Sequence, residues 1–167
     1  MLGKTTAADA VVIERTFNAP VDLIWRLWTD AEQFPHWYGP TGFTVTVVEM
    51  DVRVGGRRRL YMTPPNSSRQ IWTTGEYKEI VPAERLVYTD CPSDEAGNVL
   101  SLAAMGMGDN TNPMITEVTL LLTEVDGQTK MVMTHAGIPA DSPGASGWRM
   151  ALDKMAAYVE SALGGHA

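Results

Sequence analysis

An arginine in an otherwise apolar strand pattern is the first candidate for chemistry in this sequence. Arg58 alternates with Leu60 and Met62, and side chains two residues apart lie on the same face of a strand. A guanidinium buried on that face costs several kcal/mol unless it is paired. Three arrangements would avoid this penalty: Arg58 reaches solvent at the end of the sheet, pairs with a carboxylate of the protein, or binds an anionic group of a ligand.

His135 is the second candidate, because it shares a strand face with Met131 and Met133. A lone histidine on an apolar face is commonly a core residue whose nitrogens are hydrogen-bonded. The alternative is a general acid–base residue, a role that Glu76 or Glu117 could also fill as a cavity carboxylate. No nucleophile and base can be paired from their spacing, so the sequence assigns no catalytic residue.

Residue types that bind metals and nucleotides are not arranged in recognisable motifs. The sequence has one cysteine, Cys91, and it has no His-x-x-x-His pair or phosphate-binding loop. Asp94, Glu95 and Asp109 lack the spacing of an EF-hand loop. We therefore expect no metal or nucleotide cofactor. A single cysteine also precludes an internal disulfide, which fits a reducing compartment.

The charge and hydropathy of the chain disfavour some classes of binding partner. A formal net charge of −7 disfavours nucleic acid, because phosphates are bound by clustered Lys and Arg. The short basic run 57–59 is interpreted as a solvated strand edge. No run approaches the ~20 apolar residues of a membrane span, and residues 1–6 lack the apolar core of a signal peptide. We expect a cytoplasmic protein without membrane insertion.

Two aromatic residues fall in a loop, where large side chains commonly contact ligands or partners. Trp37 and Tyr38 are flanked by Pro35 and by Gly39-Pro40. They are predicted to line the mouth of a cavity or to dock a chaperone or a second subunit, as in a homodimer.

The spacing of apolar residues predicts strands between two helical regions. A helix is expected from Pro20 to Asp30, where apolar residues fall on one stripe, and a second short helix over 31–37. Strands are expected at Val11–Phe17, Phe43–Met50, Arg57–Thr63, Ile71–Ile80, Leu86–Cys91, Ile115–Thr123 and Lys130–His135. Short connections, including a two-residue hairpin turn at Asp126-Gly127, require antiparallel pairing. The strands therefore form a meander.

The clearest element is an amphipathic helix from Ser146 to Leu163, which Gly164-Gly165 would stop. Helices on one side of an antiparallel sheet define an α+β fold. A strongly twisted sheet separates from its covering helix at one end, and the gap forms an apolar cavity. The 167 residues are expected to form one domain over 1–167.

The long segment 92–113 combines several glycines with Leu100, Leu102, Met105 and Met107. Connections of this length are commonly functional or mobile. Two alternatives follow: a flap that folds over a ligand, with one helical turn at Leu100–Met105, or a mobile surface loop.

Several stretches, spread in order over nearly the whole chain, together resemble a known family. They are Phe17–Asp30, His36–Pro40, Asp51–Arg57, Gly75–Thr89 and Gly147-Trp148. The sequence resembles the SRPBCC (START/Bet v 1-like) superfamily and, within it, homologues of the C-terminal domain of the heat-shock-protein-90 ATPase activator. Arg58 stands where such proteins usually have an aromatic residue.

The resemblance implies a helix-grip fold, β-α-α-β(6)-α, in which a curved antiparallel sheet wraps a long C-terminal helix around a hydrophobic cavity. It implies no particular reaction. Eukaryotic activators bind their chaperone with an additional N-terminal domain, for which the chain has no space ahead of Val11, so a chaperone partner is not expected.

We therefore expect the chain to bind a lipid-like or aromatic small molecule between the sheet and the last helix. The alternatives are a protein-interaction domain of the stress response and a cyclase- or hydrolase-type enzyme of the same superfamily. The residues expected around the ligand are Trp28, Trp37, Tyr38, Arg58, Met62, Trp72, Tyr88, Met105, His135, Trp148 and Met155.

Overall fold

The computed structural model describes residues 10–164. Its elements are β1 (Ala10–Phe17), α2 (Val21–Thr29), the 3-10 turn η1 (Phe34–His36), β2 (Thr44–Met50), β3 (Arg57–Thr63), β4 (Ile71–Val81), β5 (Arg85–Thr89), β6 (Cys91–Ser93), β7 (Glu117–Val125), β8 (Gln128–Ala136) and α3 (Pro143–Gly164). Residues 1–6 and Gly165, which entered the sequence analysis, lie outside the described residues.

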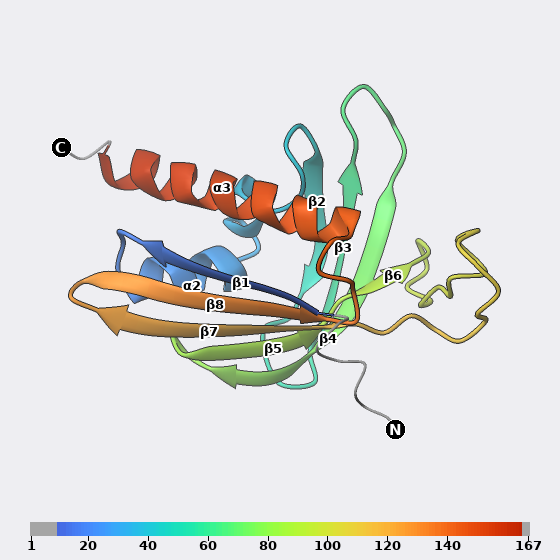
Figure 1. The fold of residues 1–167 in the computed structure, drawn as a ribbon, viewed down its shortest axis with the longest axis horizontal. Helices are drawn as coiled ribbons and strands as arrows, with labels where there is room; N and C mark the ends of the chain where they lie inside the picture. Colours follow the sequence, from blue (N-terminus) through green and yellow to red (C-terminus); the bar gives the residue numbers. More distant parts are fainter. Residues whose placement is uncertain (1–9, 165–167) are drawn as a thin grey trace.

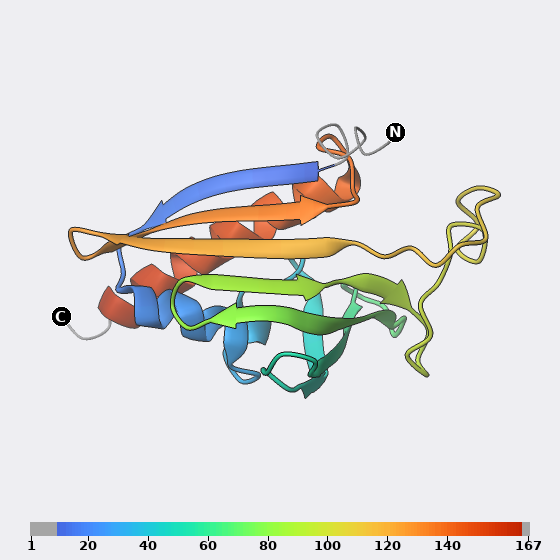
Figure 2. The same ribbon diagram turned by 90° about the horizontal axis from the view of Figure 1, so that it is seen from below.

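An antiparallel sheet wraps around the long C-terminal helix (Figures 1 and 2). Its strands follow the order β1-β8-β7-β5-β4-β3-β2, and β6 pairs with β4 beside this path. The helix α3 lies across the concave face, with the shorter α2 on the same side. This arrangement confirms the predicted α+β helix-grip fold.

The β7–β8 hairpin forms where the sequence predicts it. Val125 pairs with Gln128, so the loop has two residues. Asp126 and Gly127 have φ angles of 54° and 80°, the left-handed values that a tight hairpin turn requires.

The predicted strand Leu86–Cys91 is interrupted at Asp90, which lies between β5 and β6. Residues 77–81 of β4 pair with β5, whereas residues 72–74 pair with β6. At the junction, a Cβ on Gly75 would lie 1.8 Å from the main-chain oxygen of Thr89, so this close approach requires a residue without a side chain. The sheet changes direction here, and Asp90 lies at the change.

The helix α3 begins three residues earlier than predicted, at Pro143. The hydroxyl of Ser142 accepts a hydrogen bond from the main-chain N–H of Ala145, and proline is favoured in the first helical position. Trp148, Leu152 and other residues on one side of the helix are buried in the core. The expected second short helix over 31–37 is only the 3-10 turn η1.

The segment that follows β6 is folded rather than open. It contains single bridges between Ser93 and Val99 and between Ser101 and Pro113. Met105 donates its main-chain N–H to the carbonyl of Ser101, which is one turn of the helical type in the predicted place. No helix within residues 10–164 is long and apolar enough to cross a membrane.

Candidate ligand-binding cavity

A cavity of about 470 Å³ lies between the start of α3, the bend of the sheet and the segment 92–116. The first turns of α3 and the strands β3 and β4 form two of its walls. The third wall is the long connection after β6. Its lining residues are Tyr38, Gly39, Pro40, Met62, Ile71, Thr73, Asp90, Pro92, Met105, Met107, Met114, Thr116, His135, Ile138, Pro143, Gly144, Gly147, Trp148 and Ala151.

The structure brings five of the eleven expected ligand residues to this cavity. These five are Tyr38, Met62, Met105, His135 and Trp148. The other six lie in the core or on the opposite face of the sheet: Trp28, Trp37, Arg58, Trp72, Tyr88 and Met155.

The prediction that Trp37 lines a mouth or an exposed docking loop is wrong. Its side chain is 0% exposed, and its indole N–H donates a hydrogen bond of 2.7 Å to the main-chain oxygen of Leu27. The ring packs against Trp28 and Phe34, at centroid distances of 4.6 and 5.1 Å. The turn η1 folds these aromatic residues inward, so Trp37 belongs to the core.

Trp72 lies on the opposite face of the sheet from the cavity. Its neighbours in β4, Ile71 and Thr73, both line the cavity, and adjacent strand residues point to opposite faces. The Trp72 ring packs instead on Tyr61, with a centroid distance of 4.8 Å. The strand alternation explains this correction.

Trp28, Tyr88 and Met155 are core residues, each no more than 1% exposed. Trp28 stacks on Trp148, whose ring lies between this core and the cavity. The expectation that Trp28, Tyr88 and Met155 lie around the ligand is therefore wrong.

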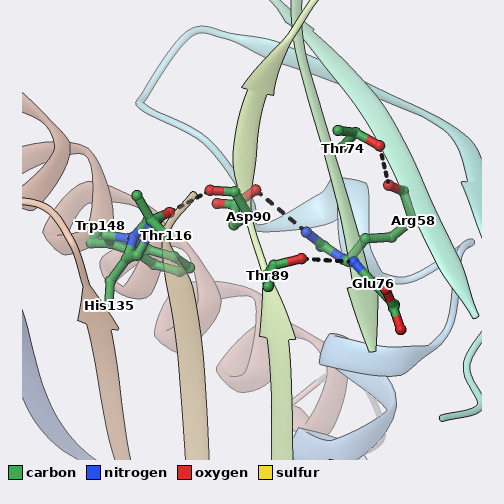
Figure 3. A network of polar contacts seen from close by, with 8 residues as sticks. All are labelled: Arg58, Thr74, Glu76, Thr89, Asp90, Thr116, His135 and Trp148. Carbon is green, nitrogen blue, oxygen red and sulfur yellow. Dashed lines mark hydrogen bonds and ion pairs between the residues drawn. The ribbon is translucent and has the colours of Figure 1, made fainter. Parts of the chain in front are cut away.

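Arg58 is buried on the face that it shares with Leu60, at 2% exposure. Its Nη1 lies 3.5 Å from Oδ1 of Asp90, which is 7% exposed. The expectation that Arg58 reaches solvent is therefore wrong. The alternative of pairing with a carboxylate of the protein is the arrangement that forms (Figure 3).

Aromatic rings surround the guanidinium of Arg58. Its central carbon lies 3.9 Å from the ring centroid of Tyr88, 5.4 Å from that of Phe34 and 6.0 Å from that of Tyr77. Burial opposes the charged form, but Tyr88, Tyr77 and Asp90 together raise the pKa of Arg58 above its usual value. The side chain therefore carries a full positive charge inside the core.

A chain of hydrogen bonds links Asp90 to α3 (Figure 3). The indole N–H of Trp148 donates to Nδ1 of His135 over 2.8 Å. Because Nδ1 accepts, the neutral ring carries its proton on Nε2, which lies 2.7 Å from the hydroxyl of Thr116. The Thr116 hydroxyl in turn donates to the main-chain oxygen of Asp90.

These bonds occupy both ring nitrogens of His135. Burial is the main cause that lowers its pKa below the ordinary value, so the ring is neutral near pH 7. A general base needs a free lone pair within reach of its substrate, and the lone pair on Nδ1 is already bound by Trp148. His135 therefore fits the hydrogen-bonded core interpretation and also lines the cavity.

Glu76 and Glu117 do not face the cavity. Both side chains are exposed, whereas their neighbours Tyr77 and Val118 are buried. The strand alternation places the two glutamates on the outer face. The hypothesis that either is a cavity carboxylate is wrong.

Asp90 is the cavity carboxylate that the sequence analysis missed. The signal was present, because a lone acidic residue follows the apolar run Leu86–Tyr88 and could have been paired with Arg58. A buried charge needs a partner of opposite sign. Among residues 10–164, no group of three or more His, Cys, Asp or Glu side chains could hold a metal ion.

The connection 92–116 contributes three methionines to the cavity wall, Met105, Met107 and Met114. Methionine is unbranched and polarizable, so it adapts to ligands of different shape. The segment therefore forms part of the cavity wall.

Comparison with known proteins agrees with this architecture. Residues 18–160 match the family described as activator of Hsp90 ATPase homolog 1-like protein. A solved structure from Chromobacterium violaceum is 27% identical, with a TM-score of 0.74, covering 91% of this chain and 97% of the other. A structure from Arthrobacter aurescens is 22% identical, with a TM-score of 0.76, covering 96% and 91%.

A third structure, from Mycobacterium smegmatis, is 23% identical with a TM-score of 0.74 and covers 94% of both chains. No curated protein matches the sequence. The family match covers most of the chain, and the similar structures have the same fold. The chain belongs to the activator of Hsp90 ATPase homolog 1-like family, within the SRPBCC (START/Bet v 1-like) superfamily.

Proposed function

We propose that the protein binds a hydrophobic small molecule, lipid-like or aromatic, in the cavity beside the first turns of α3. The observation that carries this proposal is the size and lining of the cavity. Its volume of about 470 Å³ falls in the range of small-molecule sites, roughly 300–1,000 Å³. Most of its lining side chains are apolar, and the few polar ones gather at the bend of the sheet.

The energetics favour an apolar ligand. Burying apolar surface contributes roughly 25 cal/mol for each Å² removed from water. Met62, Ile71 and Met114 present such surface to the interior of the cavity. A ligand that fills this space would cover the methionines of the connection 92–116 and the ring of Trp148.

Neither alternative function is supported by an observation comparable to the cavity. An enzyme that uses His135 as its base would first have to break the bond from Trp148. A docking role for the aromatic loop requires an exposed Trp37, and that side chain is buried. Ligand binding is therefore the function to test first.

The test uses Nile red, a neutral apolar dye whose fluorescence rises in apolar surroundings. The wild-type protein is expected to bind it saturably. Met114→Glu places a charge on the cavity wall and should weaken binding by roughly tenfold or more, because a charge without a partner is costly to bury. Met150→Glu is the matched control, since Met150 lies on α3, is exposed and does not line the cavity.

Native mass spectrometry of gently purified protein provides the second measurement, in which an apolar adduct is expected. Absence of both dye binding and an adduct would contradict the proposal. Equal dye binding by Met114→Glu and by the wild type would show that the dye binds elsewhere.

A further inference from the structure

The cavity wall contains one charged side chain among its described lining residues, and its charge is negative. That side chain is Asp90. Its positive partner Arg58 does not reach the wall and lies behind the carboxylate among aromatic rings. A ligand therefore meets the carboxylate before it meets the guanidinium.

One oxygen of the Asp90 carboxylate lacks a hydrogen-bond donor, although the hydroxyl of Tyr38, on the same cavity wall, lies within hydrogen-bonding reach of the carboxylate. Oδ1 is buried and accepts no hydrogen bond from residues 10–164; its contact with Arg58 is an ion pair at 3.5 Å. The hydroxyl of Thr116 donates to the main-chain oxygen of Asp90 and not to its carboxylate. His135 uses its own N–H on Thr116.

A second polar atom on the same wall also lacks a partner. The buried hydroxyl oxygen of Thr73 has no hydrogen-bond partner in the described part of the chain, and Thr73 lines the cavity with Asp90. Buried polar atoms are normally paired. One end of the cavity thus offers an acceptor-rich polar wall, and the remainder is largely apolar.

The charges at this wall restrict the polar group that can bind there. Asp90 and Arg58 already form a neutral pair, so a cationic head group would bring an uncompensated positive charge into the core. An anionic head group would lie against the carboxylate of Asp90. An uncharged donor satisfies the acceptors and adds no charge.

Resting on the proposed ligand-binding function, we propose that the ligand is an amphiphile with an uncharged hydrogen-bond donor, a hydroxyl or phenol, which binds at Asp90 and Thr73. The cavity selects against carboxylate and ammonium head groups. An uncharged head group differs from the anionic ligand group that the sequence left open for Arg58.

The test compares decanol, decanoate and decylamine, which share one alkyl chain, for binding to the full chain near neutral pH by isothermal titration calorimetry. Decanol is expected to bind at least roughly tenfold more tightly than either charged analogue, because burying an unpaired charge is costly. Equal or tighter binding of decanoate or decylamine would overturn the head-group assignment but leave ligand binding intact. Failure of all three to bind would overturn both proposals.

A paired variant tests whether Asp90 is the cause. Asp90→Asn alone would leave Arg58 without its partner and could prevent folding, so it is combined with Arg58→Met, which leaves a neutral core. In this double variant the preference for decanol over decanoate should fall by roughly threefold or more, because the repulsion by Asp90 is removed while the cost of desolvating the carboxylate remains. A preference that remains at its wild-type value would overturn the role of Asp90.

An independent measurement on the wild-type protein needs no variant. The carboxyl carbon of labelled decanoic acid can be titrated by NMR in the presence of excess protein. The pKa of the bound acid is expected to lie above its value in water, because Asp90 disfavours a second negative charge. A bound pKa below the value in water would mean that Arg58 dominates, and it would overturn the proposal.

Discussion

His135 shows how a single residue connects the cavity to the covering helix. Its Nδ1 accepts the indole N–H of Trp148 on α3, and its Nε2 bonds to Thr116 next to the sheet. Only the neutral ring can do this, because a protonated imidazole would place an N–H against the indole N–H. The protonation state of His135 and the attachment of α3 are therefore linked.

This link predicts a pH dependence of stability. The folded pKa of His135 is lowered, mainly by burial, from an ordinary value of 6.5. As pH falls below 6.5 the unfolded chain takes up a proton that the folded chain resists. The neutral ring of His135 therefore contributes fully to the free energy of unfolding above the unfolded pKa. This contribution is lost as the pH falls through the folded pKa.

Urea unfolding of the wild type and of His135→Gln, from neutral to mildly acidic pH, measures the effect. At neutral pH the variant should lose about 1–2 kcal/mol, through its disrupted hydrogen bonds, and its stability should vary less with pH than that of the wild type. His36→Gln is the control, since His36 stacks on Tyr158 away from this chain of bonds. A flattened profile in His36→Gln instead would contradict the assignment.

At the scale of the elements, the bend where β4 passes from β5 to β6 creates the polar wall. Two regular strands would continue past each other, but Gly75 allows the main chain of Thr89 to approach closely. The Thr89 hydroxyl also accepts the N–H of Glu76 over 2.9 Å. The bend places Asp90 where it meets Arg58 and the cavity.

Alanine substitutions at Gly75 and at the control position Gly147 test the role of the bend. In Gly75→Ala the new Cβ would fall 1.8 Å from the Thr89 oxygen, so the backbone must move, and we expect a loss of about 1–3 kcal/mol in unfolding free energy. In Gly147→Ala the nearest atom lies at 3.6 Å, on Pro40, and the helical position should gain about 0.5–1 kcal/mol. Chemical denaturation measures both, and equal stability of the two variants would refute the account of the bend.

At the scale of the whole molecule, the sheet and α3 enclose two different interiors. Leu152, Met155 and Val159 pack α3 into the core, whereas its first turns border the cavity. The connection 92–116 lies near these first turns and extends beyond the sheet (Figures 1 and 2). Ligand binding should therefore stabilise the connection 92–116 more than parts of the sheet that lie far from the cavity.

Hydrogen exchange of the protein with and without decanol measures this difference in local stabilisation. The main-chain N–H groups of Met105, Met107 and Met114 donate to carbonyls within the connection. We expect their exchange to slow by roughly tenfold when the cavity is filled, because the ligand stabilises the folded connection. The amides of residues 125–128, at the far hairpin, should change little. Protection confined to that hairpin would contradict the position of the site.

The sequence by itself determined the elements and the faces of most strands. Alternation along β3 put Arg58 with Leu60, and Asp126-Gly127 identified a hairpin, because these features depend on residues close in the chain. The helical periodicity of the C-terminal segment predicted α3 within three residues of its observed start. Together with the family resemblance, these local signals were sufficient for the helix-grip fold.

Only the tertiary structure decided which side chains meet. It paired Arg58 with Asp90, buried Trp37 against Trp28, and placed Glu117 outside the cavity. Strand periodicity identifies residues that share a face, but it does not identify the residue that a fold brings opposite them from a distant segment. The charge at the cavity wall depends on such long-range contacts, and so the sequence left three arrangements open for Arg58, whereas the fold places the carboxylate of Asp90 at the wall.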